Sequence, residues 1–174
     1  MAREEMDHVD EMIAAWRAEL PETATTELEI VKRLGRLKGR VEEVTQAVLG
    51  EYGLTYADFD VLATLRRAGV PYRLKPSLLA SRTSLTTGGT SNILQRLTGA
   101  GLVEREPDPD DGRSSWVRLT PLGVRRAEEL AVATTRAHRE LFSGVPETAV
   151  RDLADLLRTM LLALGDHAGP SRRG

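Results

Sequence analysis

The sequence predicts a mainly α-helical protein with one small β-hairpin and long helices near both ends of the chain. Apolar residues recur every three or four positions through most of the 174 residues, which is typical of amphipathic helices. Capping and helix-ending residues divide these stretches. One segment, residues 102–119, instead has two short extended stretches around a loop rich in Pro, Asp and Gly, as a hairpin does. The length suits a single domain.

Two helices are predicted before the centre of the chain. The first covers residues 4–20, and Pro21 ends it. The second runs from about residue 28 to residue 51, and Gly53 ends it. A helix of this length spans roughly 36 Å. The second helix is therefore long for a small domain.

The centre of the chain predicts a helix-turn-helix. A third helix begins after Thr55 and ends at Gly69, and residues 72–75 are extended. A short helix over residues 77–82 and a turn at 83–85 follow, and then a helix over residues 88–100. In such a motif the second helix can lie in the major groove of DNA, so we name it the recognition helix.

A hairpin follows the recognition helix directly. Residues 102–106 and 116–119 are the two strands, and Val117 and Leu119 share one face. Two more helices follow, one from Thr120 to about residue 142 and one from Pro146. A hairpin in this position makes the lobe a winged helix-turn-helix, in which the hairpin is the wing.

Composition excludes several classes of function. There is no cysteine, so disulfides and thiol catalysis are excluded, and the 3 histidines show no metal-ligand spacing. No Ser/His/Asp set or phosphate-binding loop points to an enzyme. We expect no metal and no cofactor. No apolar run approaches the length of a membrane span, so we expect a cytoplasmic protein with no membrane contact.

The formal net charge of −2 gives no basic signature for nucleic acid across the whole chain. Charge is unevenly spread, however: acidic residues dominate residues 1–29, whereas basic residues outnumber acidic ones over residues 70–118. A near-neutral total can therefore conceal a basic face.

The start of the recognition helix carries short polar side chains and glycines, which can meet base edges and phosphates without steric blockage. Leu94 and Leu97 are expected to face the core, and Arg96 can reach a phosphate. The alternative is a polar, capped helix that contacts nothing. The predicted DNA contacts of this region are Lys75, Thr86, Thr87, Gly88, Thr90, Ser91, Asn92 and Arg96.

Two residues of the wing loop complete the predicted DNA contacts. Arg113 lies at the tip, where a guanidinium can enter the narrow minor groove. Asp111 lies two residues away and can orient that guanidinium. The alternative is a solvated turn with an incidental ion pair, which contributes little.

These residues resemble the MarR family of bacterial winged-helix regulators. The motif reads Asp111-x-Arg113-x-x-x-Val117-x-Leu119-Thr120-x-x-Gly123, preceded by Leu97-x-x-x-Gly101-Leu102-Val103. The resemblance implies a homodimer that binds a pseudo-palindromic DNA operator. Residues 1–52 and 121–167 would be dimerisation helices, and residues 53–120 would be the DNA-binding lobe. Several apolar helix faces also favour a partner.

The resemblance further implies a transcriptional repressor that a small anionic or aromatic ligand releases from DNA. The extra N-terminal helix is similar to the urate-responsive branch of the family, whose pocket residues match Trp16, Asp60 and Arg105. Ile93 stands where that branch has an arginine. An anion that loses one cationic partner loses about 1.5–3 kcal/mol, which argues against urate itself.

Each of the three pocket residues has an alternative role. Trp16 fits the apolar stripe of its helix. Asp60 can be solvated, or it can pair with Arg105 or a neighbouring arginine. Arg105 can be a surface residue of its strand. For the whole chain, the alternative function is a winged helix that contacts protein and binds no operator.

Overall fold

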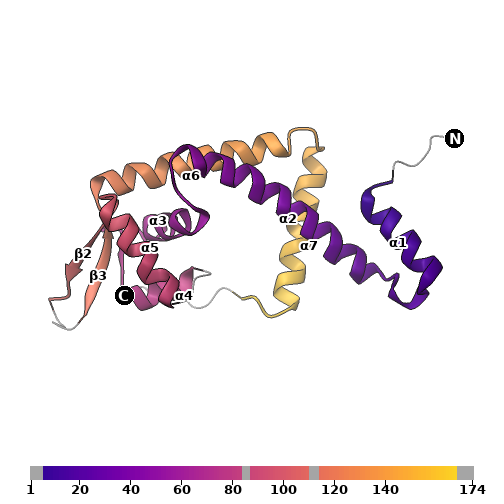
Figure 1. Cartoon of the computed structure of the whole chain (residues 1–174), viewed down its shortest axis with the longest axis horizontal. Helices are drawn as coiled ribbons and strands as arrows, with labels where there is room; N and C mark the ends of the chain where they lie inside the picture. Colours follow the sequence, from indigo (N-terminus) through magenta and orange to yellow (C-terminus); the bar gives the residue numbers. More distant parts are fainter. Residues whose placement is uncertain (1–5, 84–86, 110–113, 168–174) are drawn as a thin grey trace.

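The computed structural model describes residues 6–83, 87–109 and 114–167. It is mainly helical with a small antiparallel sheet, as predicted (Figure 1). The helices are α1 (His8–Glu19), α2 (Thr26–Glu51), α3 (Tyr56–Arg67), α4 (Pro76–Arg82), α5 (Thr87–Gly99), α6 (Pro121–Leu141) and α7 (Glu147–Ala163). A single 3-10 turn, η1 (Pro21–Thr23), joins α1 to α2. No described helix is long and apolar enough to cross a bilayer.

The sheet has three strands in the order β1-β3-β2, where β1 is Arg73–Leu74, β2 is Val103–Pro107 and β3 is Ser115–Leu119. Strands β2 and β3 form the predicted hairpin, with Val103 opposite Leu119. The short extended segment before α4 was predicted, but its pairing with β3 was not. Its two residues pair with Arg118 and Val117. Strand β1 thereby joins the start of α4 to the base of the wing.

One apolar core holds the DNA-binding lobe together. Side chains from α3, α4, α5, the sheet and α6 pack in one cluster, which includes Leu62, Leu79, Leu97, Val117 and Leu130. All five are at most 1% exposed. Burial of one such side chain contributes about 1.5–3 kcal/mol to the stability of the folded lobe. The lobe is therefore a rigid support for α5 and the wing.

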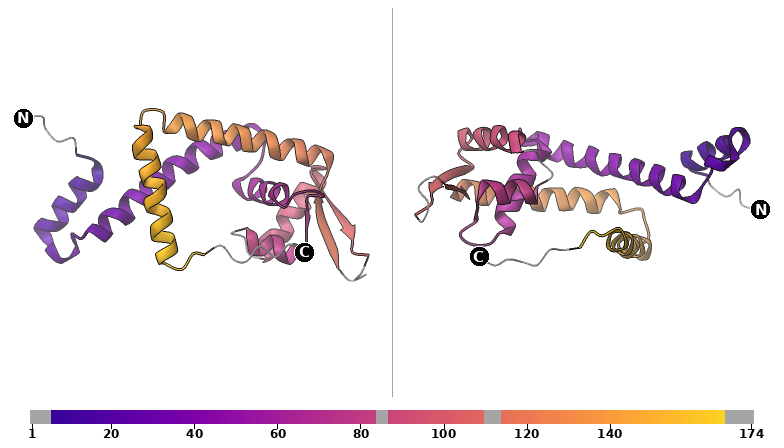
Figure 2. Two further views of the ribbon diagram at one scale, coloured as in Figure 1. Left: turned by 180° about the vertical axis from the view of Figure 1, so that it is seen from behind. Right: turned by 90° about the horizontal axis from the view of Figure 1, so that it is seen from below.

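The two long helices α2 and α6 lie side by side and extend away from the lobe (Figures 1 and 2). Thr45 of α2 is buried, and its hydroxyl lies 2.8 Å from Nε2 of His138 on α6. Helix α1 folds back at the far end of α2, so it lies at the end of the molecule opposite the wing.

The start of α6 is held against the end of α5 by a close backbone contact. Thr120 caps α6 as predicted, since its hydroxyl accepts a hydrogen bond from the Gly123 amide at 3.0 Å. The same hydroxyl donates to the carbonyl oxygen of Gly101 at 2.7 Å. A Cβ atom on Gly123 would overlap the carbonyl oxygen of Leu102. Only glycine allows this approach, which sets the angle between wing and α6.

Candidate nucleic-acid interface and effector residues

Helix α5 turns a polar face to solvent because its apolar residues are fixed in the core. Leu94 and Leu97 are 3% and 1% exposed, as predicted, whereas Ser91 and Asn92 are exposed. Thr90 is buried, so the structure does not present it to DNA and we leave it out of the proposed interface. Thr86 lies outside the described residues, as do the side chain of Thr87 and the exposure of Gly88.

Arg96 joins α5 to the start of α3. Its Nη2 atom lies 2.6 Å from Oδ1 of Asp58, whose side chain is only 3% exposed. The other oxygen of Asp58 accepts hydrogen bonds from the Thr55 amide and hydroxyl, at 2.9 and 2.7 Å. The carboxylate therefore caps α3 and orients α5 together. The sequence offered a signal for this role, because the Thr55-x-x-Asp58 spacing is that of a capping box.

The loop end of the wing strands is held to the start of α4. Lys75, the residue before α4, forms an ion pair with Asp108 and a 2.6 Å hydrogen bond with the Ser114 hydroxyl. Asp108 and Ser114 lie at the two sides of the wing loop, where the Asp108 amide donates to the Ser114 carbonyl oxygen at 3.1 Å. The predicted DNA contacts Asp111 and Arg113 lie outside the described residues.

The three predicted effector residues are not brought together within one chain. Trp16, on α1, lies at the end of the molecule opposite the lobe that holds α3 and β2 (Figures 1 and 2). Asp60 of α3 lies 4.0 Å from a nitrogen of Arg67, which is the predicted pairing with a neighbouring arginine. Arg105 is exposed on β2. Ile93 is 6% exposed and belongs to the lobe core.

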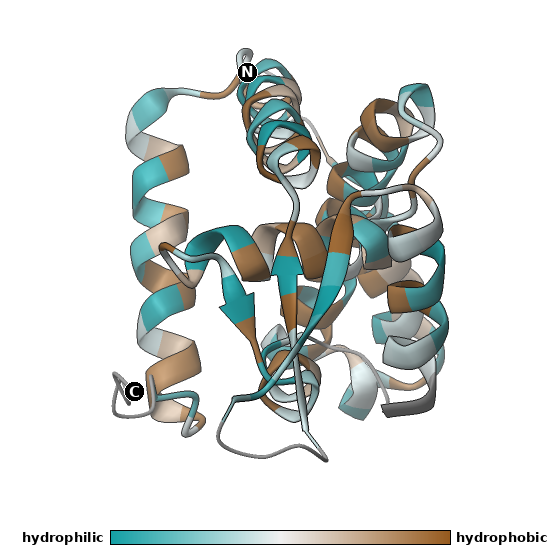
Figure 3. Cartoon of the chain, turned by 90° about the vertical axis from the view of Figure 1, so that its left-hand side faces the viewer, coloured by the Kyte–Doolittle hydropathy of each residue, from teal (hydrophilic) through white to brown (hydrophobic). Residues whose placement is uncertain are grey.

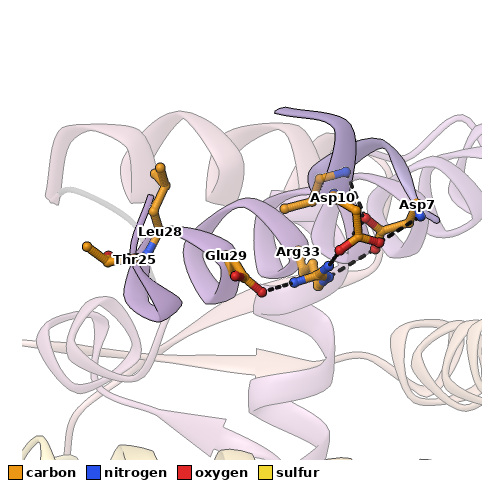
Figure 4. Close-up of polar contacts among 7 residues, drawn as sticks. Asp7, Asp10, Thr25, Leu28, Glu29 and Arg33 are labelled. Carbon is orange, nitrogen blue, oxygen red and sulfur yellow. Dashed lines mark hydrogen bonds and ion pairs between the residues drawn. The ribbon is translucent and has the colours of Figure 1, made fainter. Parts of the chain in front are cut away.

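A single arginine anchors α1, the helix that carries Trp16, to α2. Arg33 of α2 bonds Asp7 at 2.9 Å, Asp10 at 2.6 Å and Glu29 at 2.8 Å (Figure 4). Asp7 also caps α1 by accepting the amides of Val9 and Asp10. At the start of α2, Thr25 accepts the Leu28 amide at 3.3 Å. Sequence reasoning missed Arg33, because only the fold brings residues from both helices around it.

We expect Arg33→Met to release α1 without unfolding the lobe. The substitution leaves Asp7 and Asp10 without their common cation, and Val9 and Ile13 are the only buried residues of α1. Hydrogen exchange should accelerate in α1 and stay unchanged in α3. Arg40→Met is the matched control, since Arg40 is on the same helix and pairs with Glu43 of α2 itself. Equal exchange in both variants would contradict the anchor.

The α1 contact is expected to weaken only in strong acid. The hydrogen bond from Arg33, followed by the Asp10 amide, lowers the pKa of Asp7 from 3.8 to about 2. A lowered pKa means that the contact contributes fully above pH 3.8 and is lost as the pH falls through about 2. Trp16 emission in a Trp116→Phe chain should report this transition. The Arg33→Met variant, which lacks the contact, should show no such transition, and coincident curves would refute the assignment.

Helix α7 stands apart from the rest of the chain and exposes its apolar face (Figure 3). None of its residues is buried, and Leu156 is 62% exposed. A groove of about 920 Å³ separates α7 from α2, with Leu34 and Leu37 on one wall and Leu153 and Met160 on the other. An apolar face of this extent is typical of a surface that another protein covers.

The lobe is a winged helix-turn-helix that its own apolar core supports. Long helices with exposed apolar faces extend from it. Together these features define the architecture of a winged-helix regulator. Comparisons with known proteins identify the family. The model of the MarR family matches residues 52–114. The transcriptional regulator PecS of Dickeya dadantii is 30% identical over 148 residues, which cover 83% of this chain and 89% of PecS. The chain therefore belongs to the MarR family, whose curated relatives here are transcriptional regulators and not enzymes.

Solved structures give the same fold. A variant of E. coli MarR in complex with operator DNA superposes with a TM-score of 0.66 at 25% identity, over 84% of this chain and 97% of that one. BpsR of Bordetella bronchiseptica, whose DNA binding is regulated by 6-hydroxynicotinic acid, gives a TM-score of 0.64 at 26% identity, over 75% and 91% of the two chains.

Proposed function

We propose that the chain is a homodimeric transcriptional repressor that binds a pseudo-palindromic operator and is released by a small anionic or aromatic ligand. The exposed polar face of α5, beside the wing and held by a rigid core, is the observation that carries the proposal. Ser91 and Asn92 would meet base edges, and Arg113 at the wing tip would enter the minor groove. The likeness to MarR bound to its operator supports this arrangement.

The homodimer rests on the apolar faces that one chain leaves uncovered. Leu153, Leu156 and Met160 of α7 face a groove whose other wall is α2. A second copy supplies the complementary surface in a two-fold arrangement, since each copy offers the same groove and the same helix. Two lobes related by a two-fold axis would then match the two halves of a pseudo-palindrome.

The effector is proposed to bind between the dimer helices and the lobe. BpsR, which responds to 6-hydroxynicotinic acid, supports a small aromatic anion as the class of ligand. Arg105 would supply a cation. Because Trp16 and Asp60 lie in distant parts of one chain, a site that holds both would take α1 from the second copy. The buried side chain at Ile93 cannot offer a charge, so we infer an effector other than urate.

A gel shift with the DNA upstream of the gene tests operator binding. Wild-type chain should bind at low salt and lose affinity steeply as salt rises, because phosphate contacts release counterions. Arg113→Ala should weaken binding without unfolding the protein, and Asn92→Ala should change the preferred bases. If the chain binds no upstream DNA at low or at high salt but binds another protein, the alternative of a winged-helix interaction module is favoured.

A thermal-shift screen of small aromatic carboxylates tests the effector. A ligand that binds only the folded dimer should raise its melting temperature and release the operator. Arg105→Gln should reduce both effects, with Arg139→Gln on α6 as a control of equal charge. A ligand that stabilises the dimer but leaves the operator bound would contradict release.

A further inference from the structure

Trp116 lies close to two cations near the loop end of the wing strands. The ring centroid is 4.4 Å from Nζ of Lys75 and 4.8 Å from the guanidinium carbon of Arg73. Strands β1 and β3 are antiparallel, with Arg73 opposite Arg118 and Leu74 opposite Val117. The next position in this register sets Lys75 beside Trp116. A cation at this distance from an indole is attracted by the ring's negative face.

The indole has no polar contact that would hold it otherwise. Its Nε1 atom is buried and has no hydrogen-bond partner among the residues that the structure describes. A buried, unpaired N–H group costs free energy, so the contacts of the ring with the two cations and the sheet must offset it. Arg73 is itself fixed by Glu106 of β2 at 2.8 Å. The ring therefore lies within a network that crosses all three strands.

Lys75 is the centre of this network. Its ammonium contacts the indole, the Asp108 carboxylate and the Ser114 hydroxyl together. The side chain of Asp108 is 9% exposed and that of Lys75 is 26% exposed. Three donors of one ammonium are thus directed at one strand and at both sides of the wing loop. A lysine that reached out to a phosphate would have to leave these partners.

We propose that Lys75 is a wing-positioning residue, which holds the hairpin at a fixed angle to α4 through Trp116, Asp108 and Ser114 rather than contacting DNA itself. The proposal rests on the proposed function, since a positioned wing matters only if the wing meets DNA. It replaces the expectation that Lys75 contacts DNA. The wing would then be oriented before DNA arrives, which reduces the entropy lost on binding.

The Asp108→Asn variant separates positioning from direct contact by the sign of its effect. Removal of a negative charge beside DNA, which also frees a lysine for phosphate, strengthens binding if Lys75 is a DNA contact. If Lys75 positions the wing, the same variant weakens operator binding. We expect about a tenfold loss for Asp108→Asn and for Lys75→Gln, and a double variant no worse than either. Glu104→Gln, on the same hairpin and paired with Arg118, is the control for charge alone.

Fluorescence tests the network without DNA. In a Trp16→Phe chain, Trp116 is the remaining emitter, because the sequence has 2 tryptophans. Lys75→Gln should shift its emission to longer wavelength and increase quenching by acrylamide, whereas Arg82→Gln at the other end of α4 should change neither. Circular dichroism of each variant shows that the fold is retained.

The outcomes separate wing positioning from the network around Lys75 and from operator binding itself. Red-shifted emission together with weaker operator binding by Asp108→Asn supports wing positioning. Operator binding by Asp108→Asn that equals or exceeds that of wild type overturns it and restores Lys75 as a predicted DNA contact. Unchanged emission in Lys75→Gln overturns the network itself. Wild-type chain that binds no DNA refutes the proposed function, and the emission result then still decides whether the network exists.

Discussion

Replacing Gly123 by alanine is expected to lower the free energy of unfolding of this chain strongly. The new Cβ would overlap the carbonyl oxygen of Leu102, which is backbone and belongs to the link between α5 and β2. Relief requires the start of α6 to move away, which breaks the hydrogen bonds that Thr120 donates to the carbonyl oxygens of Gly101 and Leu102. We expect a loss of about 3 kcal/mol or more, a large part of the stability of a typical domain.

Thermal and chemical unfolding at a fixed protein concentration measure this effect. Gly50→Ala is the matched control, because Gly50 is helical and a Cβ there meets nothing within 4 Å. That substitution should raise stability by up to about 1 kcal/mol, since alanine favours the helix. Equal free energies of unfolding for the two variants would contradict the close contact between Gly123 and the carbonyl oxygen of Leu102.

The second large effect is expected at α7. Leu156→Glu combined with Met160→Glu puts two charges on the wall of the groove that a second copy is proposed to fill. Burying unpaired charges costs several kcal/mol, so the dimer should dissociate. Operator affinity should fall by at least about a hundredfold, because each half-site would be bound separately.

Light scattering after size exclusion reports the assembly, and a gel shift reports the operator. Thr159→Glu is the control, since Thr159 is exposed on the same helix and its position aligns with Asp152 and Asp155 on the polar face. This variant should remain dimeric. A dimer that survives the double substitution would place the interface elsewhere on the chain.

Helices and strands were predictable to within a few residues, because apolar spacing and capping residues carry local information. Residues 4–20 were predicted as a helix and α1 spans His8–Glu19, since Asp7 is the cap. Thr55 and Thr120 cap their helices as predicted. The buried pair Val117 and Leu119 followed from strand alternation. Capping residues and apolar spacing involve residues that are close in the sequence, so a single sequence is enough to identify them.

Contacts between distant segments were not predictable in the same way. The pairing of β1 with β3, the anchor at Arg33 and the pair Arg96–Asp58 join residues from different elements. Thr90 has a polar side chain in a polar stretch, yet it is buried, because it lies on the same face of α5 as Leu94 and Leu97. Polarity alone therefore could not say which residues of α5 face outward. The role of Trp116 also depends on cations from other elements, Arg73 of β1 and Lys75 at the start of α4.

Selection of DNA sites from a random library tests the central proposal most directly. The full chain, bound to the library at moderate salt, should enrich an inverted repeat whose half-site centres lie about 10 base pairs or a multiple of that apart. Asn92→Ala should enrich a repeat with the same spacing and altered bases. Enrichment of single, unrepeated sites, or of no sequence at all, would contradict a dimeric operator-binding regulator.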